Sequence, residues 1–248
     1  MRLLFFYFLV ISCAHNAAMI EDIKDQSHNE KNFFTYEDYS GQYTVTREIK
    51  VQASKLISRV LILSSAGVEL ENQVAVSKFG TISSGKQKRV AILPEASHFK
   101  VWYNKKLFES KINVNKKNRT LDIEIIKPPD KIPKQEIYKL PKGSTFCYYS
   151  QLPECLKMQN LLVVAAKKPI PLYIIWDNYP FNLEQYQGIS SEPVVLGNLS
   201  LSKYDNNEFK YIVDIGNQVI FYHYDKSLNF IKMFWVSQGI SLVKQLGE

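Results

Sequence analysis

The stretch YTVTREIKV, residues 43–51, alternates apolar and polar side chains along the chain. Successive side chains of a β-strand point to opposite faces of a sheet, so this alternation gives the strand one apolar face and one polar face. The apolar face carries Tyr43, Val45, Ile49 and Val51, and the polar face carries Thr44, Thr46, Glu48 and Lys50. The stretch therefore predicts a β-strand that covers a core with one face.

The same two-residue period recurs along most of the chain. It is present in VELENQVAV, HFKVWYN, SKINVN, TLDIEII, FKYIVDI and QVIFYHY, and Gly216-Asn217 between the last two is typical of a two-residue hairpin turn. Residues 150–158, around Cys155, favour a short helix. We therefore predict a mainly β protein with a curved antiparallel sheet, barrel-like or folded as a two-sheet body.

The proline-rich stretch KPPDKIPKQEIYKLPKG, residues 127–143, divides this β region. Proline cannot donate a hydrogen bond to a sheet ladder, so the stretch cannot be a central strand. We expect it to be a crossover between the halves 41–126 and 144–248 of one β domain, 41–248. Residues 13–40 are mostly polar and weakly periodic, which predicts a flexible tether.

A run of nine apolar residues, 3–11, follows Arg2 and ends at Ser12-Cys13. A membrane-spanning helix needs roughly 20 residues, so the run has instead the length of the apolar core of a secretory signal. The stretch VISC, residues 10–13, resembles the lipobox of bacterial lipoproteins. The resemblance implies that residues 1–12 are a signal peptide and that Cys13 carries lipid. Ala14 in the next position then favours the outer membrane of a Gram-negative envelope. Ordinary signal cleavage after Ala14 is the alternative.

The three cysteines are consistent with this interpretation. An odd number of cysteines in an exported protein leaves one thiol to be explained. If Cys13 carries lipid, Cys147 and Cys155 can form a disulfide. A zinc site would need four ligands at short paired spacings, and the four histidines are scattered. We therefore expect a disulfide and no metal site.

Charge and motifs argue against two other classes of function. The net charge is +7, but the basic residues are dispersed rather than gathered in a nucleic-acid-binding motif. No stretch has the local pattern of a hydrolase nucleophile, and Ser97 and His98 point to opposite faces of a predicted strand. We therefore expect neither nucleic-acid binding, nor an enzyme, nor a cofactor.

The aromatic residues are the most informative feature for function. They make up 13% of the chain and gather in a few short stretches. Aromatic side chains on a β face either fill a core, their ordinary role, or line a ligand cavity. The candidate ligand-binding residues are Trp176, Asp177, Phe221, His223 and Trp235. For His223, a general-base role is the less favoured interpretation, and we expect an inward-facing core histidine with satisfied hydrogen bonds.

The C-terminal stretch KYIVDIGNQVIFYHYDKSLNFIKMFWVSQGISLVKQ, residues 210–245, is similar to the closing hairpins of uncharacterised exported β proteins of Gram-negative bacteria. Some of those are related to glycolipid-binding β-roll and half-barrel folds. The resemblance implies a binding protein for a lipid, glycolipid or other amphiphile in an aromatic-lined concavity. The alternative is a structural or assembly subunit of an envelope complex that uses its sheet as a docking surface for a protein partner.

Overall fold

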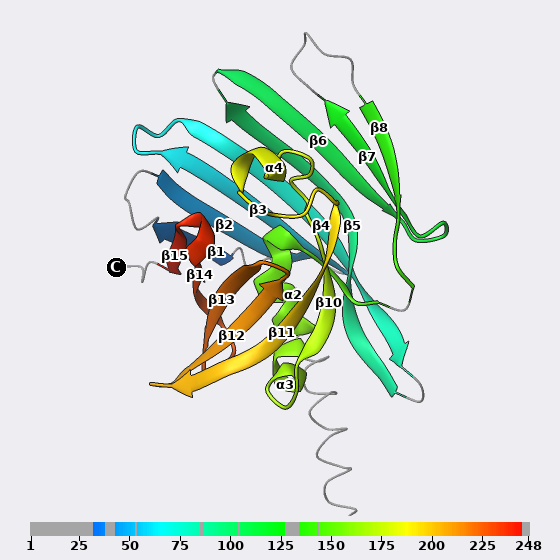
Figure 1. Cartoon of the computed structure of the whole chain (residues 1–248), viewed down its shortest axis with the longest axis vertical. Helices are drawn as coiled ribbons and strands as arrows, with labels where there is room; N and C mark the ends of the chain where they lie inside the picture. Colours follow the sequence, from blue (N-terminus) through cyan, green and yellow to red (C-terminus); the bar gives the residue numbers. More distant parts are fainter. Residues whose placement is uncertain are drawn as a thin grey trace, which may run out of the picture.

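The computed structural model describes residues 32–37, 43–52, 54–84, 87–103, 105–126, 134–142 and 144–244. Cys13 and the predicted signal peptide lie outside these residues. The described residues include fifteen strands, which form one sheet in the order β8-β7-β6-β5-β4-β3-β2-β1-β15-β14-β13-β12-β11-β10-β9. The mainly β prediction is confirmed (Figure 1). The strands are β1 (Asn32–Glu37), β2 (Tyr43–Gln52), β3 (Lys55–Ser64), β4 (Glu69–Ser84), β5 (Gln87–Tyr103), β6 (Lys106–Asn115), β7 (Thr120–Ile126), β8 (Lys134–Lys139), β9 (Phe146–Tyr148), β10 (Ile170–Ile175), β11 (Val194–Asp205), β12 (Glu208–Ile215), β13 (Gln218–Asp225), β14 (Phe230–Trp235) and β15 (Ile240–Lys244).

The helices are short. They are the 3-10 helices η1 (Tyr149–Gln151) and η2 (Val236–Gln238) and the α-helices α2 (Leu152–Met158), α3 (Leu161–Ala165) and α4 (Asn182–Gln185). Together η1 and α2 confirm the helix expected at 150–158, whereas α3 and α4 were not predicted. None of the helices in the described part of the chain has the length and apolar character needed to cross a membrane.

Each stretch quoted above for its two-residue period forms or overlaps a strand. All neighbouring strands pair antiparallel, except that β9 and β10 are parallel. The hairpin between β12 and β13 pairs Ile215 with Gln218. Gly216 between them has a φ of +65°, a conformation that costs glycine little because it has no Cβ. The hairpin prediction is therefore confirmed.

Two strands lie in segments for which no strand was expected. β1 falls inside the predicted tether, and it pairs with β2 on one side and with β15 on the other. The tether prediction is therefore wrong for residues 32–37, because their backbone joins the two halves of the sheet. β8 falls inside the predicted crossover and pairs with β7. It lies at the end of the sheet, where neighbouring prolines are tolerated.

The sheet rolls around the helices, so that its two halves face each other across α2 (Figure 1). On its inner face, Tyr224 of β13 donates a hydrogen bond to the carbonyl of Pro153 in α2, and Tyr211 of β12 donates one to the carbonyl of Leu162 in α3. The end strand β9 packs against β5 without pairing with it. Strands β6–β8 therefore continue past the point at which the roll closes.

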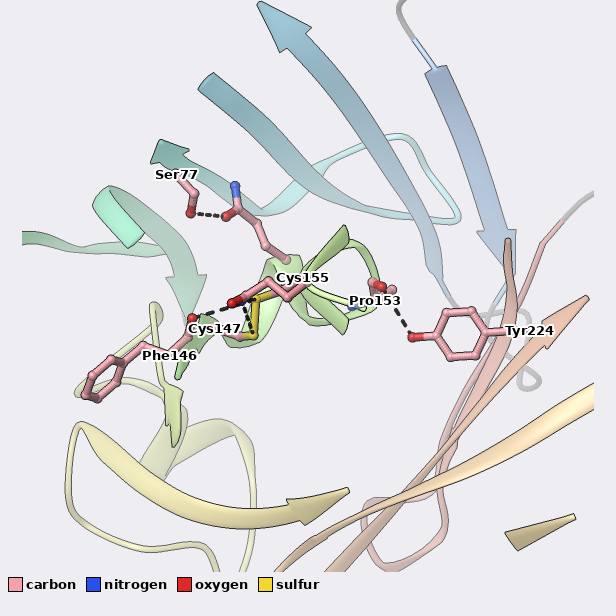
Figure 2. The surroundings of a disulfide bond; sticks show 8 residues. Ser77, Phe146, Cys147, Pro153, Cys155 and Tyr224 are labelled. Carbon is pink, nitrogen blue, oxygen red and sulfur yellow. Dashed lines mark hydrogen bonds between the residues drawn. A yellow bond between two sulfur atoms is a disulfide. The ribbon is translucent and has the colours of Figure 1, made fainter. Parts of the chain in front are cut away.

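The predicted disulfide is present. Cys147 in β9 and Cys155 in α2 are bonded, with their Cα atoms 5.9 Å apart, and both are fully buried. Figure 2 shows α2 held between the two halves of the sheet, with Ser77 of β4 on one side and Tyr224 of β13 on the other. The disulfide therefore fixes this central helix to an end strand of the sheet.

Candidate functional site

The inner face of the sheet encloses a cavity of about 450 Å³. Its walls come from β2–β5 on one side and β13–β15 on the other, and η1, α2 and the segment around α4 complete it. The lining residues are Tyr43, Val45, Arg47, Val60, Ile62, Leu70, Glu71, Gln73, Val101, Trp102, Tyr149, Ser150, Pro153, Asn178, Gln185, Tyr186, Tyr222, Phe230, Met233, Gln238, Ile240 and Leu242. Most of these are aliphatic or aromatic, so the cavity can take up apolar groups.

Two of the lining tyrosines stand on a buried aromatic cluster. Tyr149 contacts Trp176 with ring centroids 4.7 Å apart, and Tyr186 contacts Trp235 at the same separation. Behind them, Trp176 and Trp235 stack at 6.0 Å with their planes 11° apart. The Trp235 indole nitrogen also donates to Gln218 at 3.0 Å. Packing of this kind holds the two tyrosine rings in position at the cavity wall.

Polar side chains gather where η1 and α2 meet the sheet. Arg47 of β2 is buried and donates to both carboxylate oxygens of Glu154, at 3.0 and 2.8 Å. It also donates to the carbonyl of Ser150 at 2.7 Å. A bidentate pair of this geometry is among the stronger ion pairs in proteins. The charge of Arg47 is therefore matched within the protein.

Glu71 of β4 is a second buried charged group at the cavity. Gln185 of α4 donates to its Oε2 at 2.6 Å, and Asn178 donates in turn to Oε1 of Gln185 at 2.8 Å. Burial, with a smaller contribution from nearby Asp177, raises the pKa of Glu71 to about 7, and the Gln185 hydrogen bond opposes this rise. At neutral pH this carboxyl can therefore be either protonated or ionised.

Asp177 lies behind the cavity wall. It is fully buried and accepts hydrogen bonds from the backbone N–H of Ser150, at 3.2 Å, and from the Ser150 hydroxyl. Burial raises its pKa to about 6, although the bonds from Ser150 oppose this. Asp177 therefore fixes the first turn after β9, which places Tyr149 and Ser150 at the cavity.

The residues predicted to bind ligand fall into two groups. Trp176, Asp177 and Trp235 come together, fully buried, in the layer behind the cavity wall. Phe221 and His223 lie on the outer face of β13, because the residues that alternate with them along the strand are the buried ones. None of the five is among the residues that line the cavity.

The surroundings of His223 differ from an inward-facing core position. Its Nδ1 lies 3.3 Å from Glu208, and its ring packs against Phe234 at 5.5 Å. Partial burial lowers its pKa, although Glu208 opposes this. On the same face, the Lys210 ammonium lies 4.2 Å from the centre of the Phe221 ring. The expectation of an inward-facing histidine is therefore wrong, because Tyr222 and Tyr224 take the inner positions of β13.

Sequence reasoning did not single out Arg47 and Glu71. Arg47 lies on the same face of β2 as Val45 and Ile49. A charged residue on this apolar face was the sequence feature that could have identified it. In β4, the inner positions are Glu71, Gln73, Ala75 and Ser77. Because the mainly polar face of β4 turns inward, a prediction that places the more hydrophobic face of the strand inward gives β4 the wrong orientation in the sheet.

Among the residues that the structure describes, no group of three or more His, Cys, Asp or Glu side chains is arranged to hold a metal ion.

The chain has a distant likeness to a solved bacterial structure. No protein-family model and no curated protein matches it. It is similar to a β-barrel-like protein of the domain of unknown function DUF1849 from Brucella abortus, with 11% identity and a TM-score of 0.44. The similarity covers 88% of this chain and 95% of that one. A likeness at this level assigns no function.

Proposed function

We propose that this protein is a non-catalytic cell-envelope lipoprotein that binds a lipid, glycolipid or other amphiphile in the inner-face cavity. The cavity of about 450 Å³, with its apolar wall and its small group of polar side chains, is the observation that carries the proposal. Ligand sites in proteins commonly have volumes of about 300–1,000 Å³ and this mixture of lining residues. The volume suits a single alkyl chain with a small head group.

The proposed location rests on the sequence. The VISC stretch supports a lipid on Cys13, and an anchored protein would hold the cavity close to a source of amphiphiles. Each buried methylene of an acyl chain contributes about 0.8 kcal/mol to anchoring, so a multiply acylated terminus binds a membrane stably.

The binding proposal predicts that filling the cavity abolishes uptake of an apolar probe. The full-length chain with Cys13→Ser is used, so that no attached lipid can occupy the cavity. The neutral dye N-phenyl-1-naphthylamine should bind with a stoichiometry of about one and gain fluorescence. Ile62→Trp should weaken this binding by about tenfold or more, because Ile62 lines the cavity and the larger ring would occupy it.

The control for this experiment is Leu61→Trp. Leu61 precedes Ile62 in β3, so its side chain lies on the opposite face of the sheet. We expect Leu61→Trp to bind the dye as the parent does. Absence of saturable binding in the parent, or equal loss in the two variants, would contradict the proposal.

The outer edge of β8 favours docking of an envelope protein as a second function. β8 ends the sheet, and no described strand pairs with its other edge. Its Ile137 side chain is 76% exposed, and an exposed edge can pair with a strand of a partner. A photo-reactive residue at position 137 should form a specific cross-link in cells, whereas one at exposed Tyr204 should not. The same cross-links at both positions would argue against docking at β8.

A further inference from the structure

The charges at the cavity do not favour an anionic ligand. Among the described residues that line it, two are charged: Arg47 and Glu71. Arg47 already binds Glu154 through both carboxylate oxygens. An anion would reach the guanidinium only by displacing this carboxylate, and removing one partner from a buried ion pair is strongly unfavourable.

Among the residues that the structure describes, Glu71 has no such cationic partner. The groups that act on its carboxyl are Gln185, which donates a neutral hydrogen bond, and Asp177, which has the same charge. An ionised carboxylate in a buried site is stable only when it is paired or strongly hydrogen-bonded. The cavity therefore offers a position at which a ligand cation would complete a charge pair.

Asn178 gives an independent indication of a ligand at the same place. This residue is 2% exposed and lines the cavity. Its amide nitrogen donates to Gln185, but its Oδ1 atom has no hydrogen-bond partner among the described residues. A buried acceptor without a donor is uncommon and costs free energy. Glu71 and Asn178 both contact Gln185, so a carboxyl group without a described cationic partner and an acceptor without a described donor lie beside the same amide.

We propose that the amphiphile bound in this cavity carries an ammonium head group, which donates hydrogen bonds to the carboxylate of Glu71 and to Oδ1 of Asn178. A primary ammonium supplies a positive charge and three donors. Its alkyl chain would lie against the apolar wall formed by residues such as Ile62, Met233 and Leu242. This proposal rests on the amphiphile site proposed above and adds the chemical class of its ligand.

The titration of Glu71 supports the proposal. Its pKa is raised to about 7, so a bound ammonium would favour the ionised form and release a proton near neutral pH. Alkylamines keep their charge in this range, since an amine has a pKa of about 10. Of the other titratable groups that face Glu71, Tyr149 and Tyr186 stay protonated, because burial raises their pKa values above the ordinary tyrosine value of 10. Asp177, with a pKa near 6, changes charge just below this range. Binding should therefore strengthen between pH 6 and pH 8.

The test is competition for the dye site by three amphiphiles with the same alkyl chain. Dodecylamine, dodecanol and dodecanoate are compared at pH 8, below their micelle-forming concentrations, on the full-length Cys13→Ser chain. Dodecylamine should displace the dye at a concentration about tenfold or more below that of dodecanoate, as expected for one charge-assisted hydrogen bond. Glu71→Gln should remove most of this preference while keeping dye affinity. Glu184→Gln, the same change at an exposed position of α4, should not.

Each result separates this proposal from the more general one. If the dye does not bind, the amphiphile site itself is wrong. If the dye binds but dodecanoate competes as well as dodecylamine, the ammonium proposal is wrong and the amphiphile site stands. The ammonium proposal is equally wrong if Glu71→Gln keeps the full preference. Dye binding by the variant shows that its cavity has formed, so misfolding cannot be mistaken for loss of selectivity.

Discussion

Glu71 makes the stability of the fold depend on pH. Its pKa is about 7 in the folded protein and 4.5 when unperturbed, so between these values the folded state keeps a proton that the unfolded state has lost. Stability therefore falls as pH rises through this window. Glu71→Gln should remove the penalty, raising the free energy of unfolding at pH 8 by about 3 kcal/mol and changing it little at pH 4.5.

Urea unfolding of parent and variant at several pH values measures this effect. The relevant quantity is the difference in free energy of unfolding between the two proteins at each pH, because other groups titrate in the same range. Asp177 has a raised pKa and acts in the same direction as Glu71. His223 has a lowered pKa and acts in the opposite direction, since the fold loses its contribution as pH falls. A Glu71→Gln protein less stable than the parent at pH 8 would show that the ionised carboxylate is not destabilising.

For single residues, the hydrophobicity pattern of the sequence predicts which face of a strand is buried but not what the buried side chains contact. The alternation in QVIFYHY, residues 218–224, places Phe221 and His223 on one face of β13 and Tyr222 and Tyr224 on the other, as in the structure. It could not say which side chains would line a cavity, since a cavity wall and a core have the same pattern. The polar inner face of β4 shows the limit, because it is explained only by the side chains that it meets. There, Ser77 donates to Gln151, and Gln151 donates to the carbonyl of Ala75.

Among the elements, α2 is the one most dependent on a covalent bond. It has 7 residues, too few for a helix to be stable in isolation. The disulfide ties it to β9. Its residue Pro153 and Ser150 in the preceding η1 line the cavity. Replacing both cysteines by alanine should lower the free energy of unfolding by about 2–3 kcal/mol on the chain-entropy estimate. It should also weaken dye binding, since the helix would no longer be held in place.

Chemical denaturation and dye titration of the double variant measure the two effects. In the parent protein, both sulfur atoms should resist alkylation until the chain is unfolded and reduced, because they are buried. Unchanged stability and dye affinity in the variant would mean that packing alone positions α2. The disulfide itself could be predicted from cysteine number and spacing. The central place of η1 and α2 could not, because η1 contacts β4 and α2 contacts β13, and both strands are remote in sequence.

In the whole molecule, the two halves share their cores. Ile49, Leu56 and Ile92 of the first half pack in one cluster with the tryptophans of the second. Phe99, Ile112 and Leu121 pack in another with Ile175 and Phe181. The antiparallel sheet could be predicted from local periodicity. The roll that brings β9 against β5 could not, because no local pattern records which distant strands meet.

Because neither half has a core of its own, the protein should unfold in a single transition. Replacing Trp102 by Phe leaves Trp176 and Trp235 as fluorescent probes of the second half, whereas circular dichroism follows the whole sheet. The two midpoints should coincide. The cavity takes its walls from both halves, so an amphiphile that displaces the dye should raise both midpoints equally. At one hundred times its dissociation constant, it should add about 2.7 kcal/mol to the free energy of unfolding. Separate transitions, or a ligand that shifts only one of them, would show that the halves fold independently and that the cavity belongs to one of them.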